Sequence, residues 1–204
     1  MTVFRIEVRV SEGSSDPRGG AALKQANDAG FTPSSIDTTS VYLVQGDLDD
    51  AAVSTIANEL LSDPVTEVAK IGSSKPHADS IIEVHPQPGV MDPEAQAVES
   101  AIEHLLGENV LVQTARRFDF YGIDTDEAEK LARHCFANTV VHDIHTTPYH
   151  PNEFPRGHAH DMVVPEIPIT TLNDEELETM SRDSHLFLDL EEMQGIQTHY
   201  KNLG

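Results

Sequence analysis

The chain begins with a strict alternation of apolar and polar positions. Over residues 3–10 the expected inward set is Phe4, Ile6, Val8 and Val10, and the expected outward set is Arg5, Glu7 and Arg9. A period of two residues predicts a β-strand with one buried face. Asp16 and Pro17 then predict the start of a helix, because aspartate caps free backbone N–H groups and proline suits the first helical position.

The same pattern returns in the middle of the chain. Ile82 and Val84 alternate with Glu83 and His85, and Asp92-Pro93 follows. The matching pairs are Ile6 and Ile82, Val8 and Val84, Asp16 and Asp92, Pro17 and Pro93, Ala21 and Ala97, Gly46 and Gly122, Asp50 and Asp126, and Ala52 and Ala128. Their common spacing of about 76 residues is typical of a duplicated small domain rather than a solenoid. We expect the halves to pack together, since so small a unit buries little surface alone.

The rest of each half alternates strand and helix signals. Residues 36–44 and 109–121 have strand patterns, and apolar stripes at helical spacing follow in residues 52–61 and 128–136. Residues 65–71 and 140–144 predict a last strand in each half. The boundaries we predict are repeat 1 at 1–72, a link at 73–80, repeat 2 at 81–146, a linker rich in proline and histidine at 147–171, and a helical tail at 172–204.

The tail has two predicted acidic helices, Asn173 to Arg182 and Leu190 to Leu203. Asp189 and Glu192 have the spacing of a capping box at the start of the second helix. One face of that helix carries an apolar stripe formed by Leu190, Met193, Ile196 and Tyr200, and Gln197 lies on the same face. A tail this short is not expected to bury the stripe by itself, so we predict that these four apolar residues bind a partner surface.

Charge narrows the classes of partner. The chain has 204 residues, with 13 Lys and Arg against 35 Asp and Glu, for a formal net charge of −22. Such a surface repels nucleic-acid backbones and anionic lipid, so neither nucleic acid nor a membrane is expected as a partner. A single cysteine, Cys135, fits a reducing compartment and a structural thiol better than a nucleophile. No leader or membrane span is recognised in the pattern, and we expect a cytoplasmic protein.

Candidate chemistry is sparse. Five histidines lie close together, namely His142, His145, His150, His158 and His160. Zinc needs three or four converging ligands, and these spacings favour solvated linker histidines over a metal site. Arg116 and Arg117 are the only adjacent basic pair, and a packed or ion-paired role is favoured there over an anion site. Phosphate-loop, dinucleotide and serine-elbow motifs are missing, so we expect no catalytic, cofactor or metal residues in this chain.

Short motifs in both halves resemble a known family. They are the opening strand Phe4-Arg-Ile-Glu-Val-Arg-Val10, the helix end Leu60-Leu-Ser-Asp-Pro-Val-Thr-Glu-Val68, and, in the second half, Met91-Asp-Pro93 and Ala137-Asn-Thr-Val-Val-His-Asp143. Over residues 3–146 the chain resembles the PurS-type small subunit of phosphoribosylformylglycinamidine synthase, an ATP- and glutamine-dependent amidotransferase of purine biosynthesis. Two segments of the tail, Leu172 to Leu177 and Leu190 to Gly204, are similar to the sequence that leads into the synthetase part of that enzyme.

The resemblance implies an α+β fold of two tandem β-α-β-β-α-β units, with antiparallel sheets packed or joined as a pseudo-dimer. It implies a non-catalytic scaffold that joins synthetase and glutaminase and supports ammonia transfer, with ATP and Mg in the partner synthetase and no cofactor here. The chain is expected to be the N-terminal part of a longer synthetase or a fused double small subunit, and homo-oligomers are possible. The alternative is a small-molecule-sensing regulatory module of ferredoxin-like type.

Overall fold

The computed structural model describes residues 2–75, 77–155, 162–164 and 166–203. The chain divides into two compact units, Met1–Gly157 and His158–Gly204. The first unit contains both predicted repeats, and the second contains the predicted tail helices. Each unit is described by itself.

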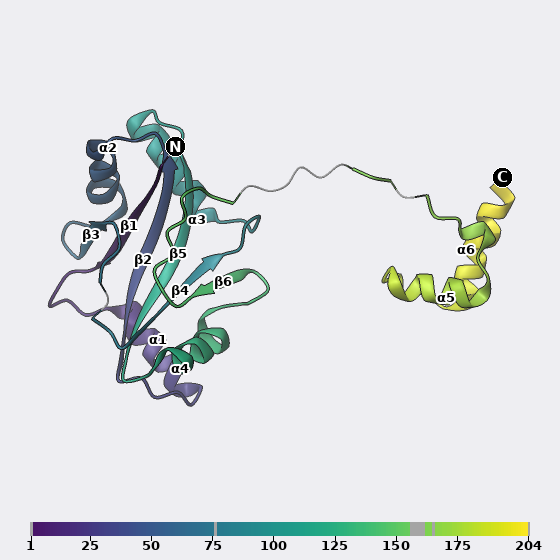
Figure 1. The fold of residues 1–204 in the computed structure, drawn as a ribbon, viewed down its shortest axis with the longest axis horizontal. Coiled ribbons are helices and arrows are strands. Elements are labelled where there is room, and N and C mark those ends of the chain that lie inside the picture. Colours follow the sequence, from purple (N-terminus) through teal and green to yellow (C-terminus); the bar gives the residue numbers. More distant parts are fainter. Residues whose placement is uncertain (1, 76, 156–161, 165, 204) are drawn as a thin grey trace. The chain divides into compact units, whose positions relative to one another are not determined.

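The first unit repeats one order of elements (Figure 1). Its first half consists of β1 (Thr2–Val10), α1 (Pro17–Asp28), β2 (Ser35–Gly46), α2 (Asp50–Thr55) with the π-helical turn η1 (Ile56–Leu61), and β3 (Glu67–Ile71). Its second half consists of β4 (Ser80–Pro86), α3 (Pro93–Leu106), β5 (Leu111–Tyr121), α4 (Thr125–Leu131) with the π-helical turn η2 (Ala132–Phe136), and β6 (His142–His145). Both halves therefore follow the order strand, helix, strand, helix, strand.

All six strands form one antiparallel sheet in the order β3-β1-β2-β5-β4-β6. The two halves meet where β2 pairs with β5 along their length, from Ser35 opposite Tyr121 to Gln45 opposite Leu111. The predicted α+β class and the joined antiparallel sheets are confirmed. The four strands per unit that the resemblance implies are wrong, because each half has three strands in the described residues, as the strand patterns predict. The segment after β2 forms α2 and η1 and not another strand, as its apolar stripe at helical spacing predicts.

Aspartate caps begin the helices at equivalent places in the two halves. Asp16 and Asp92 cap α1 and α3, and Asp49 and Asp124 cap α2 and α4. The predicted N-cap role of Asp16 is therefore confirmed. Gly19, in the first turn of α1, is needed for close packing, since a Cβ there would lie 2.2 Å from the carbonyl oxygen of Ile36 in β2.

The helices cover one face of the sheet, and their two hydrophobic cores each mix elements from both halves. In one core, Ala22 and Ala26 of α1 pack with Phe118 and Phe120 of β5 and with Leu131 of α4. The other core combines Ile6 and Val8 of β1 and Ile56 of η1 with Ala95 and Ile102 of α3. Neither half has a helix layer of its own, so the two halves are expected to fold as one cooperative unit.

The opposite face of the sheet is also covered. Val41, Leu43 and Ala115 are buried there against Phe154, with Tyr149 packed at the edge of the cluster. Residues up to Phe154 thus belong to the packed unit, which corrects the prediction of an extended linker from residue 147 onward. The apolar residues of the central strands provide a surface that this segment can bury.

The second unit consists of η3 (Ile169–Thr171), α5 (Asp174–Asp183) and α6 (Leu190–Leu203). Asp189 and Glu192 exchange side-chain to backbone hydrogen bonds of 2.9 and 3.0 Å, which confirms the predicted capping box. Ile169, Leu177 and Met193 form a small core. In the part of the chain that the structure describes, none of the helices has both the length and the apolar character needed to cross a bilayer.

Candidate functional site

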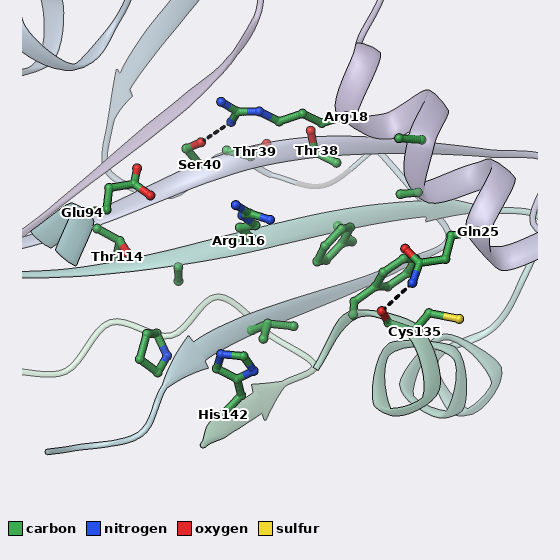
Figure 2. Close-up of a pocket in the computed structure, with 17 residues that line it drawn as sticks. Arg18, Gln25, Thr38, Thr39, Ser40, Glu94, Thr114, Arg116, Cys135 and His142 are labelled. Carbon is green, nitrogen blue, oxygen red and sulfur yellow. Dashed lines mark hydrogen bonds between the residues drawn. The ribbon is translucent and has the colours of Figure 1, made fainter. Parts of the chain in front are cut away.

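The main candidate site is a groove of about 640 Å³ on the helix-covered face of the sheet. It lies where α1, α3 and η2 leave the central strands partly open, and it is lined from both halves of the first unit. Figure 2 shows polar side chains gathered around the middle of β2 and β5. The apolar wall is formed by Val84, Phe118 and Phe136, of which Phe118 and Phe136 stack with their ring centroids 4.5 Å apart.

Two arginines face this groove from different elements (Figure 2). Arg18, in the first turn of α1, donates to Ser40 Oγ on β2 at 2.9 Å. Arg116, on β5, is exposed, and within the described residues its side chain has no hydrogen-bond or ion-pair partner. The favoured prediction of a packed or ion-paired role is therefore wrong for Arg116, but it is confirmed for Arg117, which is buried and pairs with Asp119. An exposed strand position beside an open groove leaves its guanidinium available.

One carboxylate also lines the groove. Glu94, in the first turn of α3, accepts a hydrogen bond of 2.9 Å from the Tyr42 hydroxyl. Burial, together with this bond, raises the pKa of the Tyr42 phenol, so Tyr42 remains a neutral donor near neutral pH. The carboxylate of Glu94 is thus held by a hydroxyl, and no ion pair joins it to Arg18 or Arg116 in the described part of the chain.

The other end of the groove is less polar. Gln25 of α1 donates to the carbonyl oxygen of Cys135 at 2.9 Å, a contact between the two halves (Figure 2). Cys135 is partly buried, and burial raises the pKa of its thiol. A raised pKa lowers the thiolate fraction, which suits the predicted structural role rather than a nucleophile.

A network of buried charges lies on the opposite face of the sheet. Arg5 makes two hydrogen bonds to Glu83, of 2.5 and 3.2 Å, and donates to Glu7 at 2.7 and 2.9 Å. Arg117 pairs with Asp119 at 2.6 Å. Arg5 and Glu7 are 1% and 2% exposed, so their predicted outward positions face a covered surface instead of solvent.

Backbone groups from two connecting segments complete this network. The Tyr149 amide donates to Glu83 at 3.0 Å, and the Tyr149 carbonyl accepts from Arg5 at 2.8 Å. Ser74 donates its amide and hydroxyl to Glu7. Burial raises the pKa of Glu83, but hydrogen bonds from His85, Arg5 and the Tyr149 amide outweigh it and lower that pKa to about 2. Glu83 is therefore ionised, and the network fixes both segments on the sheet.

The predicted histidine group is divided by the fold. His145 stacks on Tyr149 with ring centroids 4.3 Å apart, and His150 Nε2 lies 2.9 Å from the carbonyl oxygen of Val3. His142 Nδ1 accepts from the Asn138 amide at 3.1 Å. His142 and His145 lie on β6 and are partly buried, so a solvated state is wrong for these two, whereas His150, in the predicted linker, is exposed as predicted. His158 and His160 lie outside the described residues. Among those described, no three His, Cys, Asp or Glu side chains converge as metal ligands.

The predicted partner-binding residues of the tail separate into two groups. Met193 is fully buried against Leu177 and Ile169, and Leu190 and Ile196 pack against the same core. The expectation that the tail cannot bury this stripe is wrong, because α5 and η3 cover it. Tyr200 is 52% exposed. Only Tyr200 keeps most of its side chain accessible for the predicted role.

Sequence reasoning missed the convergence of Arg18, Ser40 and Arg116. The repeat spacing did carry a usable signal, since Ser40 and Arg116 are equivalent positions 76 residues apart and lie opposite each other in the β2–β5 pair. The missing information was that β2 and β5 would pair with each other rather than remain in separate sheets. Once they pair, equivalent residues near the centre of both strands become neighbours.

Comparison with protein families identifies part of this unit. Residues 79–148 match the PurS family, described as phosphoribosylformylglycinamidine (FGAM) synthase. This region, from just before β4 through β6, is therefore a PurS-type domain, in agreement with the resemblance seen in the sequence. A comparison with curated proteins found no match.

Proposed function

From the PurS-type domain at residues 79–148, we propose that the chain is a non-catalytic scaffold of FGAM synthase in purine biosynthesis. In this role it joins the synthetase and the glutaminase, as subunits or domains, and supports the transfer of ammonia between them. ATP and Mg belong to the partner synthetase. The reaction takes place in the cytoplasm, where the lone thiol of Cys135 stays reduced. The family match is the observation that carries this proposal.

We propose further that residues 1–72 are a second PurS-like repeat. The support is structural: the halves share one order of elements and one set of aspartate caps. Asp16 accepts from the Thr38 amide and hydroxyl at 2.7 and 2.9 Å, and Asp92 accepts from those of Thr114 at 3.0 and 2.9 Å. A covalent pair of repeats presents two related surfaces at a fixed spacing, which suits a bridge between two proteins.

Activity measurements with two nitrogen sources test the scaffold. The synthetase and glutaminase of the same enzyme are assayed with and without this chain, once with glutamine and once with free ammonium. A bridge between active sites should be needed for glutamine-dependent activity, because ammonia made at one site must reach the other. Ammonium-dependent activity of the synthetase should persist without the chain, since free ammonium needs no transfer.

Size-exclusion chromatography of the same mixtures supplies the binding test. We expect the chain to co-elute with both partners when glutamine and nucleotide are present. Separate elution of all three proteins under every condition, together with unchanged glutamine-dependent activity, would contradict the proposal. The variant Tyr200→Ala examines whether the exposed end of α6 contributes to the complex, with Lys201→Ala as a neighbouring exposed control.

A further inference from the structure

We propose that the groove between α1, α3 and η2 binds the phosphate group of a small molecule, and that Arg116 and Arg18 hold it. This binding role is additional to the scaffold, and it does not depend on which proteins the chain joins. The proposal rests on the position of Arg116, on the available donors, and on the shape of the groove.

Arg116 lies at the local two-fold axis that relates the halves. It faces Ser40 across β2 and β5, and these residues are equivalent positions of the two repeats. Arg18 and Glu94 are likewise equivalent, 76 residues apart, and both line the groove. Two identical units would have the same residue at both members of each equivalent pair. Here the members differ: Arg116 is opposite Ser40 at the axis, and Arg18 is equivalent to Glu94. The groove therefore has one arginine at the axis and a second arginine beside it.

The free guanidinium of Arg116 is unusual for its surroundings. The whole chain has only 13 basic residues against 35 acidic ones, so carboxylates for an ion pair are abundant. On the opposite face, Arg5 and Arg117 are fully engaged with carboxylates. Arg116 has no such partner among the described residues, and the nearby Glu94 is bonded to Tyr42. An uncompensated arginine in a hollow attracts an anion despite the negative net charge.

The donors around Arg116 match a phosphate group. A guanidinium presents a planar set of N–H donors that can bind two phosphate oxygens at once. Arg18 donates to Ser40 Oγ, so the Ser40 hydroxyl hydrogen can be directed either to Tyr42, with which it interacts, or to a ligand. Both arginines and Ser40 line the same groove, as Figure 2 shows. Together they supply donors from α1, β2 and β5.

The groove can accommodate more than a phosphate ion. Its volume of about 640 Å³ is within the range of small-molecule sites. Phe118 and Phe136 form an apolar wall beside the arginines, suited to a planar or apolar group. We therefore infer a phosphate monoester whose remaining part lies against this wall. Inorganic phosphate would use the same arginines without the aromatic contact.

The test compares three probes by isothermal titration calorimetry on the full chain at about 50 mM ionic strength. The probes are inorganic phosphate, a nucleoside 5′-monophosphate, and the same nucleoside without phosphate. We expect the monophosphate to bind more tightly than inorganic phosphate, and the nucleoside to bind more weakly than the monophosphate. Tighter binding of inorganic phosphate would identify the free ion as the ligand of the same site.

Arg116→Ser removes the central guanidinium and introduces the residue found at the equivalent position of the first half. We expect it to weaken phosphate binding by about tenfold or more. Arg116→Lys should recover part of the affinity because it keeps the charge without the planar fork. The control, Arg182→Ser, makes the same change of net charge in α5, which contributes no residue to the groove.

Each of the following results would overturn the proposal: no phosphate probe binds at millimolar concentration, the nucleoside binds as tightly as its monophosphate, or Arg182→Ser weakens binding as much as Arg116→Ser. Thermal unfolding of each variant checks that it is folded. If Arg116→Ser does not fold, Arg18→Ser provides the same test from an exposed helix position. Retention of full affinity in a folded Arg116→Ser or Arg18→Ser variant also excludes the assigned residues.

Discussion

Arg5 and Glu83 form an ion pair with two hydrogen bonds, although two other strands lie between theirs in the sheet. Both side chains are at most 1% exposed. They belong to different halves, Arg5 to β1 and Glu83 to β4, so the pair links the repeats on the face opposite the groove. The Tyr149 backbone bonds to both partners and brings the segment after β6 into the same network.

Breaking this pair from one side should be costly. Arg5→Met leaves the carboxylates of Glu83 and Glu7 buried without their main partner, and we expect a loss of about 3–5 kcal/mol in the free energy of unfolding. Chemical denaturation followed by circular dichroism measures it. The matched control is Arg133→Met, which removes an exposed pair with Glu129 and should cost less than about 1 kcal/mol. Equal losses for the two variants would contradict a buried network.

The double variant Arg5→Met with Glu83→Leu separates charge from packing. Removing both partners leaves fewer unpaired buried charges than Arg5→Met alone. We therefore expect the double variant to be more stable than the Arg5→Met variant. A double variant that loses the sum of the two single losses would show that Arg5 and Glu83 are not energetically coupled.

Acid should weaken the fold through Glu83. Its pKa falls from an ordinary 4.5 to about 2 in the folded chain, because hydrogen bonds from His85, Arg5 and Tyr149 outweigh the opposing effect of burial. A lowered folded-state pKa stabilises the fold above the ordinary value, and this contribution is lost as the pH falls from about 4.5 toward 2. Denaturation of the wild type and Glu83→Gln across that range measures it, and we expect a smaller acid-dependent loss in the variant.

Asp119 provides a control of opposite sign. Burial raises its pKa above the ordinary value, more than the Arg117 ion pair lowers it. A raised folded-state pKa contributes stability at low pH that is lost as the pH rises. Asp119→Asn should therefore leave the acid-dependent loss of the wild type in place. If it removes that loss and Glu83→Gln does not, the assignment to Glu83 is wrong.

The aspartate caps of α1 and α2 should differ in strength. Asp16 accepts from the Arg18 amide and from both Thr38 groups, whereas Asp49 accepts from the Ala52 amide alone within the described residues. Asp16→Ala leaves the Thr38 amide without its acceptor, so we expect a loss of about 2–3 kcal/mol against about 1 kcal/mol for Asp49→Ala. Denaturant titrations compare the two, and equal losses would show that the bonds to Thr38 contribute little.

Local patterns predicted much of this fold. The alternation around Ile6 and Ile82, the Asp-Pro helix starts and the Asp189 capping box are signals within a few residues, and the structure contains all of them. The groove required a different kind of information. Arg18 and Arg116 are 98 residues apart in the printed sequence, and only the pairing of β2 with β5 brings them to one hollow.

Two errors have one physical cause. Arg5 and Glu7 alternate with apolar residues and were therefore expected to face solvent, but residues 149–154 cover that side of the sheet. Met193 was expected to need a partner, but Leu177 and Ile169 cover it. In each case a segment distant in the sequence provides the cover, and single-sequence periodicity shows which face is apolar without showing what buries it.

The tail core gives a local prediction. Met193→Ala should destabilise the second unit by about 2–5 kcal/mol, because Met193 is fully buried in a small core. Hydrogen exchange measured by mass spectrometry should show faster exchange in residues 169–203 and little change in residues 2–155. Tyr200→Ala, at an exposed position, should leave exchange near that of the wild type. Faster exchange throughout the chain in Met193→Ala would instead indicate that the two units unfold together.

Phe154 should hold the segment after β6 on the sheet. Its side chain is 7% exposed against Val41, Leu43 and Ala115, and its amide donates to Gln45 Oε1 at 2.6 Å. Phe154→Ala should cost about 3–5 kcal/mol if the cavity does not collapse. If the segment after β6 is partly released from the sheet, the loss of stability should be smaller, and the Tyr149 and Phe154 amides should show faster hydrogen exchange.

Phe187→Ala is the control for Phe154→Ala, since Phe187 is 83% exposed in the second unit and should change stability little. Release of the segment would also open the surface over Arg5 and Glu83, because the Tyr149 backbone bonds to both. The loss from Phe154→Ala should therefore be smaller when it is combined with Arg5→Met than when it is made in the wild type. Strictly additive losses of stability, with unchanged hydrogen exchange at the Tyr149 amide, would show that Phe154 packs on the sheet without keeping solvent away from the Arg5–Glu83 pair.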